Sequence, residues 1–328
     1  MNTKGKIAIV NANSFAKYYP EYRQILQEEV GEVERFVLDK NIDSDELLAQ
    51  LKDYSYIIAG TSPQFNASFF ERAENLKLLI RFGIGYNNID VEAAKRYGIL
   101  CANVPSDLEK YDVAEQAVTL LLAVSKHLTK ADTAARKDEW SVKRERFLGI
   151  RVRGRTIGII GYGNIGSAFA EIMKYGFNCR VIAYDPYVSA ERMQKNGVCK
   201  VTFDELIADS DFISLHLSLT EETCRIISRE VISRMKKTCV LINTARGELV
   251  DEEAIADALM NDQLGGYGTD VIDNEPIKMS NRLLQCKNVV ITPHLSVYNL
   301  DCNKTMNEAV VNDVIRVSNG ELPVHMLY

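Results

Sequence analysis

Short, almost wholly apolar runs alternate with longer stretches of helical periodicity along this sequence. Runs of mostly aliphatic residues occupy positions 7–10, 56–59, 78–80, 156–160, 181–184, 212–215, 240–242 and 289–291. Between them lie segments such as 22–30 and 251–260, in which apolar residues recur at the spacing of an amphipathic helix. Strands that alternate with helices predict crossover units and parallel sheets covered on both faces, which is an α/β fold.

The chain has 328 residues, which is enough for about two domains of ordinary size. Positions 113–140 contain no glycine or proline and carry apolar residues at helical spacing, so we expect one long helix there. The following segment, 141–155, is strand-poor, and it holds basic residues at 143, 144, 146, 151, 153 and 155 against Glu145. Such a segment can bind nucleic acid, but it has one aromatic residue, Phe147, and a solvated linker is favoured.

The composition excludes several classes of protein. Hydrophobic residues make up 46% and charged residues 26%, with a net charge of −6, so the chain is neither disordered nor suited to nucleic acid. No apolar run approaches the ~18–20 residues of a membrane span. Seven widely spaced cysteines without a CxxC pair argue against disulfides and zinc and favour a cytoplasmic protein. His127, His216 and His325 also lack metal-ligand spacing, so no metal site is expected.

A glycine-rich loop follows the predicted strand at 156–160 and precedes a predicted helix at about 165–175. Its glycines are Gly161, Gly163 and Gly166, in the pattern GxGxxG. In this setting the first glycine permits a tight turn, the second lets the backbone approach a pyrophosphate, and the third lets the helix pack close to the strand. The free N–H groups at the start of the helix would then bind the phosphates.

An acidic residue follows the next predicted strand at the expected interval. Asp185 comes 19 residues after Gly166, close to the ~20 typical of the carboxylate that binds the adenosine ribose hydroxyls. Because a carboxylate repels a 2′-phosphate, this residue predicts NAD rather than NADP as the cofactor. The alternative interpretation, a glycine turn and an aspartate in a β-turn before Pro186, does not explain why strand, turn, helix, strand and acid all fall in register.

Three polar residues lie at the ends of predicted strands late in the chain, where ligands bind in open parallel sheets. Arg246, Glu275 and His294 are each ordinary surface residues when considered singly. Together they suit the reduction of a 2-oxo acid. An arginine can hold the carboxylate through two parallel hydrogen bonds, and a histidine can donate the proton. A carboxylate hydrogen-bonded to the other ring nitrogen would orient the histidine and keep it protonated.

The chain resembles the D-isomer-specific 2-hydroxyacid dehydrogenases along nearly its whole length. The matching segments are 83–90, 113–115, the glycine loop with Asp185, and 216–220, 243–247, 270–276 and 292–294. The resemblance implies two doubly wound parallel-sheet domains. A flavodoxin-like substrate domain would take residues 1–100 plus 299–328, and a Rossmann NAD-binding domain would take 101–298. It further implies a homodimer formed through the cofactor domain, with the site in the cleft between domains.

The resemblance also assigns the site residues. Arg246, Glu275 and His294 correspond to the family's catalytic Arg, Glu and His, and the backbone N–H groups of Ile84 and Gly85 to those that bind the substrate carboxylate. Thr244 and Asp270 match the residues that bound the nicotinamide end. The expected cofactor-binding residues are Gly161, Gly163, Asn164, Ile165, Gly166, Asp185, Leu217, Ser218, Thr223, Thr244, Ala245 and Asp270.

Several positions depart from the family pattern. Asn87 stands where an aspartate is usual, and Ser218 replaces a proline in the segment along the cofactor. The segment 105–115 is one residue longer than usual and has Leu108 nearest to the tyrosine of D-lactate types, while 59–64 lacks the arginine of phosphoglycerate types. These loops set substrate choice, so the sequence disfavours a phosphorylated substrate and leaves the particular 2-oxo acid open.

Two classes of function are compatible with this resemblance. The first is an NAD-dependent oxidoreductase acting on a small 2-oxo or D-2-hydroxy acid. The second is a dinucleotide-sensing binding protein, because the family includes transcriptional corepressors that can retain all three catalytic residues. Partner-binding relatives usually carry disordered extensions, and the expected last helix ends close to Tyr328, so the enzyme is the favoured interpretation.

Overall fold

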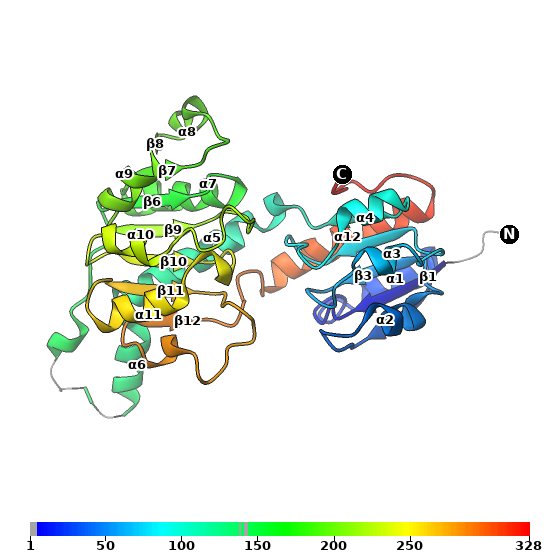
Figure 1. Cartoon of the computed structure of the whole chain (residues 1–328), viewed down its shortest axis with the longest axis horizontal. Coiled ribbons are helices and arrows are strands. Elements are labelled where there is room, and N and C mark those ends of the chain that lie inside the picture. Colours follow the sequence, from blue (N-terminus) through cyan, green and yellow to red (C-terminus); the bar gives the residue numbers. More distant parts are fainter. Residues whose placement is uncertain (1–4, 138, 141–143) are drawn as a thin grey trace. The chain divides into compact units, whose positions relative to one another are not determined.

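The computed structural model describes residues 5–137, 139–140 and 144–328, so Lys143 of the basic segment lies outside the described residues. The chain divides into two compact units (Figure 1). Unit 1 comprises Met1–Leu108 and Tyr298–Tyr328, and unit 2 comprises Glu109–Val297. Among the described helices, none is long and apolar enough to cross a membrane.

Unit 1 contains a five-stranded, wholly parallel sheet in the order β2-β1-β3-β4-β5. The strands are β1 (Gly5–Val10), β2 (Gly31–Phe36), β3 (Tyr56–Ala59), β4 (Leu78–Arg81) and β5 (Leu100–Asn103). Around them lie α1 (Glu21–Glu29), α2 (Ser44–Leu51), α3 (Ala67–Phe70), α4 (Val91–Arg96) and, from the C-terminal end of the chain, α12 (Leu300–Ser318). The strand order is that of a flavodoxin-like doubly wound domain.

Unit 2 contains a seven-stranded parallel sheet in the order β12-β11-β10-β9-β6-β7-β8. Its strands are β6 (Thr156–Ile160), β7 (Arg180–Tyr184), β8 (Cys199–Lys200), β9 (Phe212–Leu215), β10 (Val240–Asn243), β11 (Gly266–Thr269) and β12 (Val289–Ile291). The order reverses between β6 and β9, which is the switch point at which Rossmann sheets bind dinucleotides.

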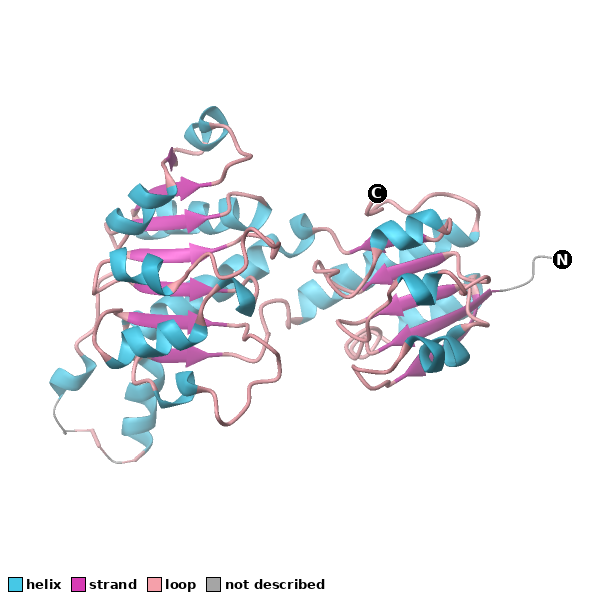
Figure 2. Cartoon of the chain, viewed as in Figure 1, coloured by secondary structure: helices cyan, strands magenta, loops and turns pink. Residues whose placement is uncertain are grey.

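The helices of unit 2 lie on both faces of its sheet, as Figure 2 shows. They are α5 (Ser106–Ser125), α6 (Leu128–Arg136), α7 (Asn164–Glu171), α8 (Ala190–Lys195), α9 (Phe203–Asp209), α10 (Arg229–Arg234) and α11 (Glu252–Met260). Shorter turns are η1 (Arg144–Phe147), η2 (Ile172–Gly176), η3 (Gly247–Leu249) and η4 (Arg282–Gln285). Because both faces are covered, the central strands β9 and β10 are buried along their whole length, and the predicted α/β class is confirmed.

The prediction of one long helix at 113–140 is wrong. The structure contains α5, which begins at Ser106, and a separate α6, with His127 between them in the left-handed region at φ 51°. The returning chain at 149–150 meets the end of α5, where the Ile150 N–H donates to the Ser125 carbonyl at 2.8 Å. A side chain at Gly149 would collide with that same carbonyl. This tertiary contact ends the helix, although no glycine or proline interrupts it.

Four strands of the structure were not predicted from the apolar runs of the sequence. The strand β2 alternates buried and exposed residues, β8 has two residues, and β5 reads Leu-Cys-Ala-Asn, which holds one large aliphatic residue. The strand β11 reads Gly-Tyr-Gly-Thr, and its glycines are required by packing. A side chain at Gly266 would overlap Val124 of α5, and one at Gly268 would lie 3.1 Å from Leu120.

Candidate active site

The glycine loop joins β6 to α7 at the switch point of the sheet. Gly161 has φ 90°, and a side chain there would overlap the His216 carbonyl after β9. A side chain at Gly166 would overlap the Gly161 carbonyl, so the absence of a Cβ lets α7 pack directly against the loop. In contrast, a Cβ at Gly163 would meet nothing within 4 Å. The loop therefore leaves room over Gly163, beside the N-terminal turn of α7, where backbone N–H groups can bind an anion.

The Asp185 carboxylate lies beside this loop. It accepts hydrogen bonds from the backbone N–H of Tyr162 at 2.8 Å and, through its other oxygen, from those of Tyr187 at 2.8 Å and Val188 at 3.2 Å. These bonds fix the acid at the end of β7 and tie it to the glycine loop. A carboxylate oxygen has further lone pairs, so it can still accept from ribose hydroxyls.

The loop after β9 forms the opposite border of the cradle, by which we mean the open space over Gly163 at the glycine loop. Leu217 follows the carbonyl that contacts Gly161. Within the same loop, the Thr223 hydroxyl donates to the Ser218 carbonyl at 2.8 Å and accepts from the Thr220 N–H at 2.7 Å. The Thr223 side chain thus holds the backbone of Ser218, the position at which the family pattern has proline.

His216 holds the start of the loop after β9 through contacts of its side chain. Its Nε2 pairs with the Ser214 hydroxyl at 2.8 Å, and its ring packs on Phe169 of α7 at 5.1 Å between centroids. The ring nitrogens are enclosed even though the residue as a whole is partly exposed, and this burial lowers the pKa of His216 to about 3. His216 is therefore a neutral packing residue and not an acid–base group.

The loop after β10 places Thr244 and Ala245 next along the sheet. The Asn243 side chain holds this loop, since its oxygen accepts from the Ala245 N–H at 3.0 Å and its amide donates to the Arg246 carbonyl at 2.8 Å. The Thr244 hydroxyl is buried and has no hydrogen-bond partner among the described residues. A buried hydroxyl without a partner is costly, so this atom suits a ligand group.

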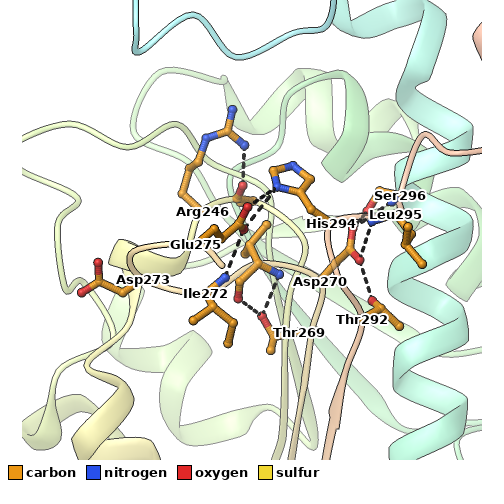
Figure 3. Close-up of polar contacts among 12 residues, drawn as sticks. Arg246, Thr269, Asp270, Ile272, Asp273, Glu275, Thr292, His294, Leu295 and Ser296 are labelled. Carbon is orange, nitrogen blue, oxygen red and sulfur yellow. Dashed lines mark hydrogen bonds and ion pairs between the residues drawn. The ribbon is translucent and has the colours of Figure 1, made fainter. Parts of the chain in front are cut away.

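The three predicted catalytic residues lie in one region of unit 2 (Figure 3). The His294 Nδ1 contacts the two Glu275 carboxylate oxygens at 2.9 and 3.2 Å, so the expected hydrogen bond is present. Glu275 is held in turn by the Ile272 N–H at 3.3 Å. The Arg246 guanidinium donates to the Ala245 carbonyl at 2.6 Å, through one of its five N–H groups. With Nδ1 engaged, the Nε2 of His294 is left to act on a ligand.

Asp270 organises the segment that carries His294, a role that sequence reasoning missed. This carboxylate is 1% exposed. It accepts four hydrogen bonds: from the Thr292 hydroxyl at 2.5 Å, the Leu295 N–H at 2.8 Å, and the Ser296 N–H and hydroxyl at 2.8 and 2.6 Å. Figure 3 shows these bonds on both sides of His294, whose own φ is 55°. The buried charge thus fixes a backbone conformation that few side chains adopt.

Charges in this region act on one another. Burial raises the pKa of the Glu275 carboxyl, but the hydrogen bond and charge of His294, with a smaller effect of Arg246, outweigh it, so the pKa lies below its usual value. Burial lowers the pKa of the Arg246 guanidinium, and nearby carboxylates, with Glu248 first, oppose this effect. An arginine stays charged under either influence. The region therefore combines a cation with an ionised carboxylate that is paired with an imidazole.

The predicted carboxylate-binding segment belongs to unit 1 and follows β4. The carbonyl of Ile84 accepts from the Asn103 side chain at 2.7 Å, and the carbonyl of Gly83 accepts from the Val104 N–H at 3.3 Å. The N–H groups of Ile84 and Gly85 have no acceptor among the described residues. Two neighbouring free N–H groups in an anchored turn can bind an anion. Asn103 is a second residue that sequence reasoning missed.

The residues present in unit 2 fit a nicotinamide dinucleotide. The open space over Gly163 and the start of α7 would hold the pyrophosphate, Asp185 the ribose, and the unpartnered Thr244 hydroxyl a polar group farther along the sheet. The cradle and the polar region beside it define unit 2 as the cofactor-binding part of an NAD-dependent oxidoreductase.

Comparison with known proteins gives the family. The model of the D-isomer specific 2-hydroxyacid dehydrogenase, NAD binding domain, matches residues 118–296. The chain is 36% identical to a glyoxylate reductase of Korarchaeum cryptofilum over 283 residues, which is 86% of this chain and 85% of that protein. The chain therefore belongs to the D-isomer specific 2-hydroxyacid dehydrogenase family, and its cofactor is NAD.

Two further relatives show the breadth of the family. The chain is 38% identical to a D-3-phosphoglycerate dehydrogenase of Methanocaldococcus jannaschii over 296 residues, covering 90% of this chain but 55% of that protein, so it spans about half the length of that relative. A D-lactate dehydrogenase of Aquifex aeolicus, solved with NAD and lactic acid, matches with a TM-score of 0.84 at 27% identity over 98% of each chain. Relatives with different substrates thus share this fold.

Proposed function

We propose that this protein reduces a small, unphosphorylated 2-oxo acid to the D-2-hydroxy acid with NADH, or catalyses the reverse oxidation. The observation that carries the proposal is the pairing of His294 with Glu275 at 2.9 Å in the same region as Arg246. An imidazole held by a carboxylate is a proton donor and acceptor, and a nearby guanidinium binds a carboxylate. Unit 2 would act as the NAD-binding domain and unit 1 as the substrate domain.

Each residue has a separate task in this mechanism. When bound, NADH supplies the hydride that reduces the substrate carbonyl. His294 donates a proton from Nε2 to the carbonyl oxygen, and it takes that proton back in the oxidation direction. Glu275 accepts the hydrogen bond from Nδ1 and stabilises the protonated ring, because its carboxylate is ionised at neutral pH.

Substrate binding would use both a side chain and backbone groups. The Arg246 guanidinium keeps N–H groups beyond the one given to the Ala245 carbonyl, and these can bind the substrate carboxylate. The free N–H groups of Ile84 and Gly85 would add to this binding. Asp270 acts one step away from the substrate, since its hydrogen bonds hold the segment 292–296 that carries His294.

We further propose a cytoplasmic homodimer. All seven cysteines are free thiols, which suits a reducing compartment. Leu128 and Leu148 are 58% and 84% exposed, and Nε2 of His127, the residue before Leu128, lies 3.3 Å from the Leu148 carbonyl. Exposed apolar side chains in one place on unit 2 favour a contact with a second copy. Sedimentation should give twice the chain mass, and Leu148→Asp should shift it toward the monomer.

The reaction is tested by the absorbance of reduced nicotinamide. Purified protein is mixed with NADH and, in turn, with 2-oxo acids of increasing side-chain size and with one phosphorylated 2-oxo acid. The proposal expects NADH oxidation with at least one unphosphorylated acid and a product of D configuration. Tight NADH binding without oxidation of any acid would instead indicate a dinucleotide-sensing protein.

A further inference from the structure

The last residues of the chain, 322–328, run alongside the sheet of unit 1, and we call them the C-terminal segment. After α12 the chain reverses direction at Gly320, whose φ is 83°. Figure 1 shows the C-terminal segment, in red, returning over unit 1. Met326 pairs antiparallel with Ala102 of β5, which is the last strand of the five-stranded sheet. The C-terminal segment therefore covers an edge of this sheet.

A buried carboxylate on α12 anchors the C-terminal segment. Asp313 is 0% exposed. It accepts hydrogen bonds from the Val324 N–H at 2.7 Å and the His325 N–H at 3.3 Å, and its second oxygen also lies 3.2 Å from the Nδ1 of His325. Other buried positions of α12 are apolar, as at Val310 and Val314. A charge among such residues is costly unless hydrogen bonds compensate for it, whereas an apolar side chain would fill the same space without that cost. We therefore assign Asp313 the task of fixing the backbone of this segment.

The anchored backbone is hydrogen-bonded to Asn103, the last residue of β5. The Asn103 N–H donates to the His325 carbonyl at 3.3 Å. The side-chain amide of the same residue donates to the Ile84 carbonyl at 2.7 Å. The next residue, Val104, donates its N–H to the Gly83 carbonyl at 3.3 Å. The end of β5 thus bonds both to the C-terminal segment and to the turn after β4 that provides the two free N–H groups described above.

Protection of the sheet edge does not by itself explain this arrangement. Backbone pairing is enough to cover an edge, and the Leu327 N–H contributes to it by donating to the Cys101 carbonyl at 2.9 Å. The buried charge acts instead on Val324 and His325, directly beside the hydrogen bond to Asn103. Hydrogen bonds to a carboxylate are stronger than those between neutral groups. The firmest anchor of the segment therefore lies next to the residue that holds the turn.

We propose that the C-terminal segment, anchored by Asp313, positions the turn at 83–85 through Asn103. This inference rests on the proposed function, in which the turn binds the substrate carboxylate. Asp313 and Asn103 are then positioning residues that act without touching the substrate. A carboxylate is bound in the ground state and in the transition state alike, so a displaced turn raises KM for the 2-oxo acid and leaves kcat nearly unchanged. KM for NADH should not change, because unit 2 binds the cofactor.

The first test is steady-state kinetics with the 2-oxo acid that wild type reduces best. Asn103→Ala removes the donor to Ile84 and should raise KM about three- to tenfold, the contribution of one hydrogen bond. Asp313→Asn leaves one acceptor oxygen for the C-terminal segment and should raise KM about threefold, with little further effect in the Asn103→Ala background. The matched control is Tyr328→Phe, which loses a hydrogen bond from the same segment to the Ile99 carbonyl at 2.6 Å. Its KM should stay within about twofold of wild type.

The second test, by NMR, does not depend on turnover. The amide resonances of Ile84 and Gly85 should shift in Asp313→Asn and in the milder His325→Ala, which loses only the Nδ1 contact, and should stay in place in Tyr328→Phe. The proposal is overturned if these resonances do not move in the first two variants, or if they move while KM does not. It is also overturned if KM follows the melting temperature in every variant, the control included. If wild type reduces no 2-oxo acid, the proposed function fails, whereas the amide resonances still decide whether the segment positions the turn.

Discussion

Replacing Asp270 by asparagine tests how the position of His294 is enforced. The carboxylate accepts four hydrogen bonds from 292–296 with both oxygens. An asparagine has one acceptor oxygen, and its NH₂ group would face the N–H of either Leu295 or Ser296. One buried donor is then left unsatisfied, at a cost of about 1–3 kcal/mol, and the charge that strengthened the remaining bonds is lost.

The predicted loss in folding free energy is therefore about 3 kcal/mol, undiminished by solvent because Asp270 is 1% exposed. For a unit of this size that corresponds to a melting temperature lower by roughly 6–12 °C. A shift of the His294 segment by about 1 Å should lower kcat about 10²-fold, with NADH still bound. Melting curves, NADH fluorescence titration and steady-state kinetics measure the three effects.

A double-variant cycle shows whether Asp270 acts through His294. In the His294→Ala background, Asp270→Asn should cause little further loss of kcat, because the group it positions is already absent. Asp273→Asn is the matched control, since it removes a carboxylate from the loop after β11, which also carries Asp270. It should change kcat by less than about twofold. If Asp270→Asn lowers kcat by the full factor even without the imidazole, the positioning argument fails.

Other variants separate the remaining roles. Glu275→Gln should shift the pH profile of reduction to lower pH, because the uncharged partner stabilises the protonated His294 less; an unchanged profile argues against the pairing. The pKa of Glu275 is depressed in the folded protein, so its pairing stabilises the fold above the unfolded value of about 4.3 and is lost as the pH falls through the folded value. Urea unfolding of Glu275→Gln should accordingly depend less on pH in that range. Arg246→Lys should chiefly raise KM for the 2-oxo acid, since a point charge cannot make two parallel bonds, and an unchanged KM would exclude the carboxylate from this site. Asp185→Ser/Tyr187→Arg should improve the use of NADPH over NADH, whereas a wild-type preference for NADPH would contradict the role of Asp185.

Sequence patterns predicted those parts of the fold in which burial determines residue type. The inner strands β3, β9 and β10 are covered on both faces, so they had to be continuous apolar runs and were found as such. The glycine loop was equally visible, because a positive φ and two close backbone approaches each require glycine.

Features that depend on contacts distant in sequence were not predictable in this way. The glycine-rich strand β11 has no apolar signal, since its composition is set by α5 packing against it. The end of α5 is set by the chain at 149–150, and the hydrogen bonds of Asp270 depend on how the segment at 292–296 turns. The residue types at the site could be predicted from the sequence. The hydrogen bonds by which one of these residues positions another could not.

In the proposed mechanism His294, held by Glu275, transfers the proton that accompanies hydride transfer. This role of His294 is tested most directly by comparing wild type with His294→Ala on the 2-oxo acid that wild type reduces best, with NADH binding measured on the same samples. Loss of a positioned proton donor typically costs about 10²–10⁴-fold in rate, so kcat should fall by that factor while the dissociation constant for NADH stays unchanged. Near-normal turnover in His294→Ala would contradict the mechanism.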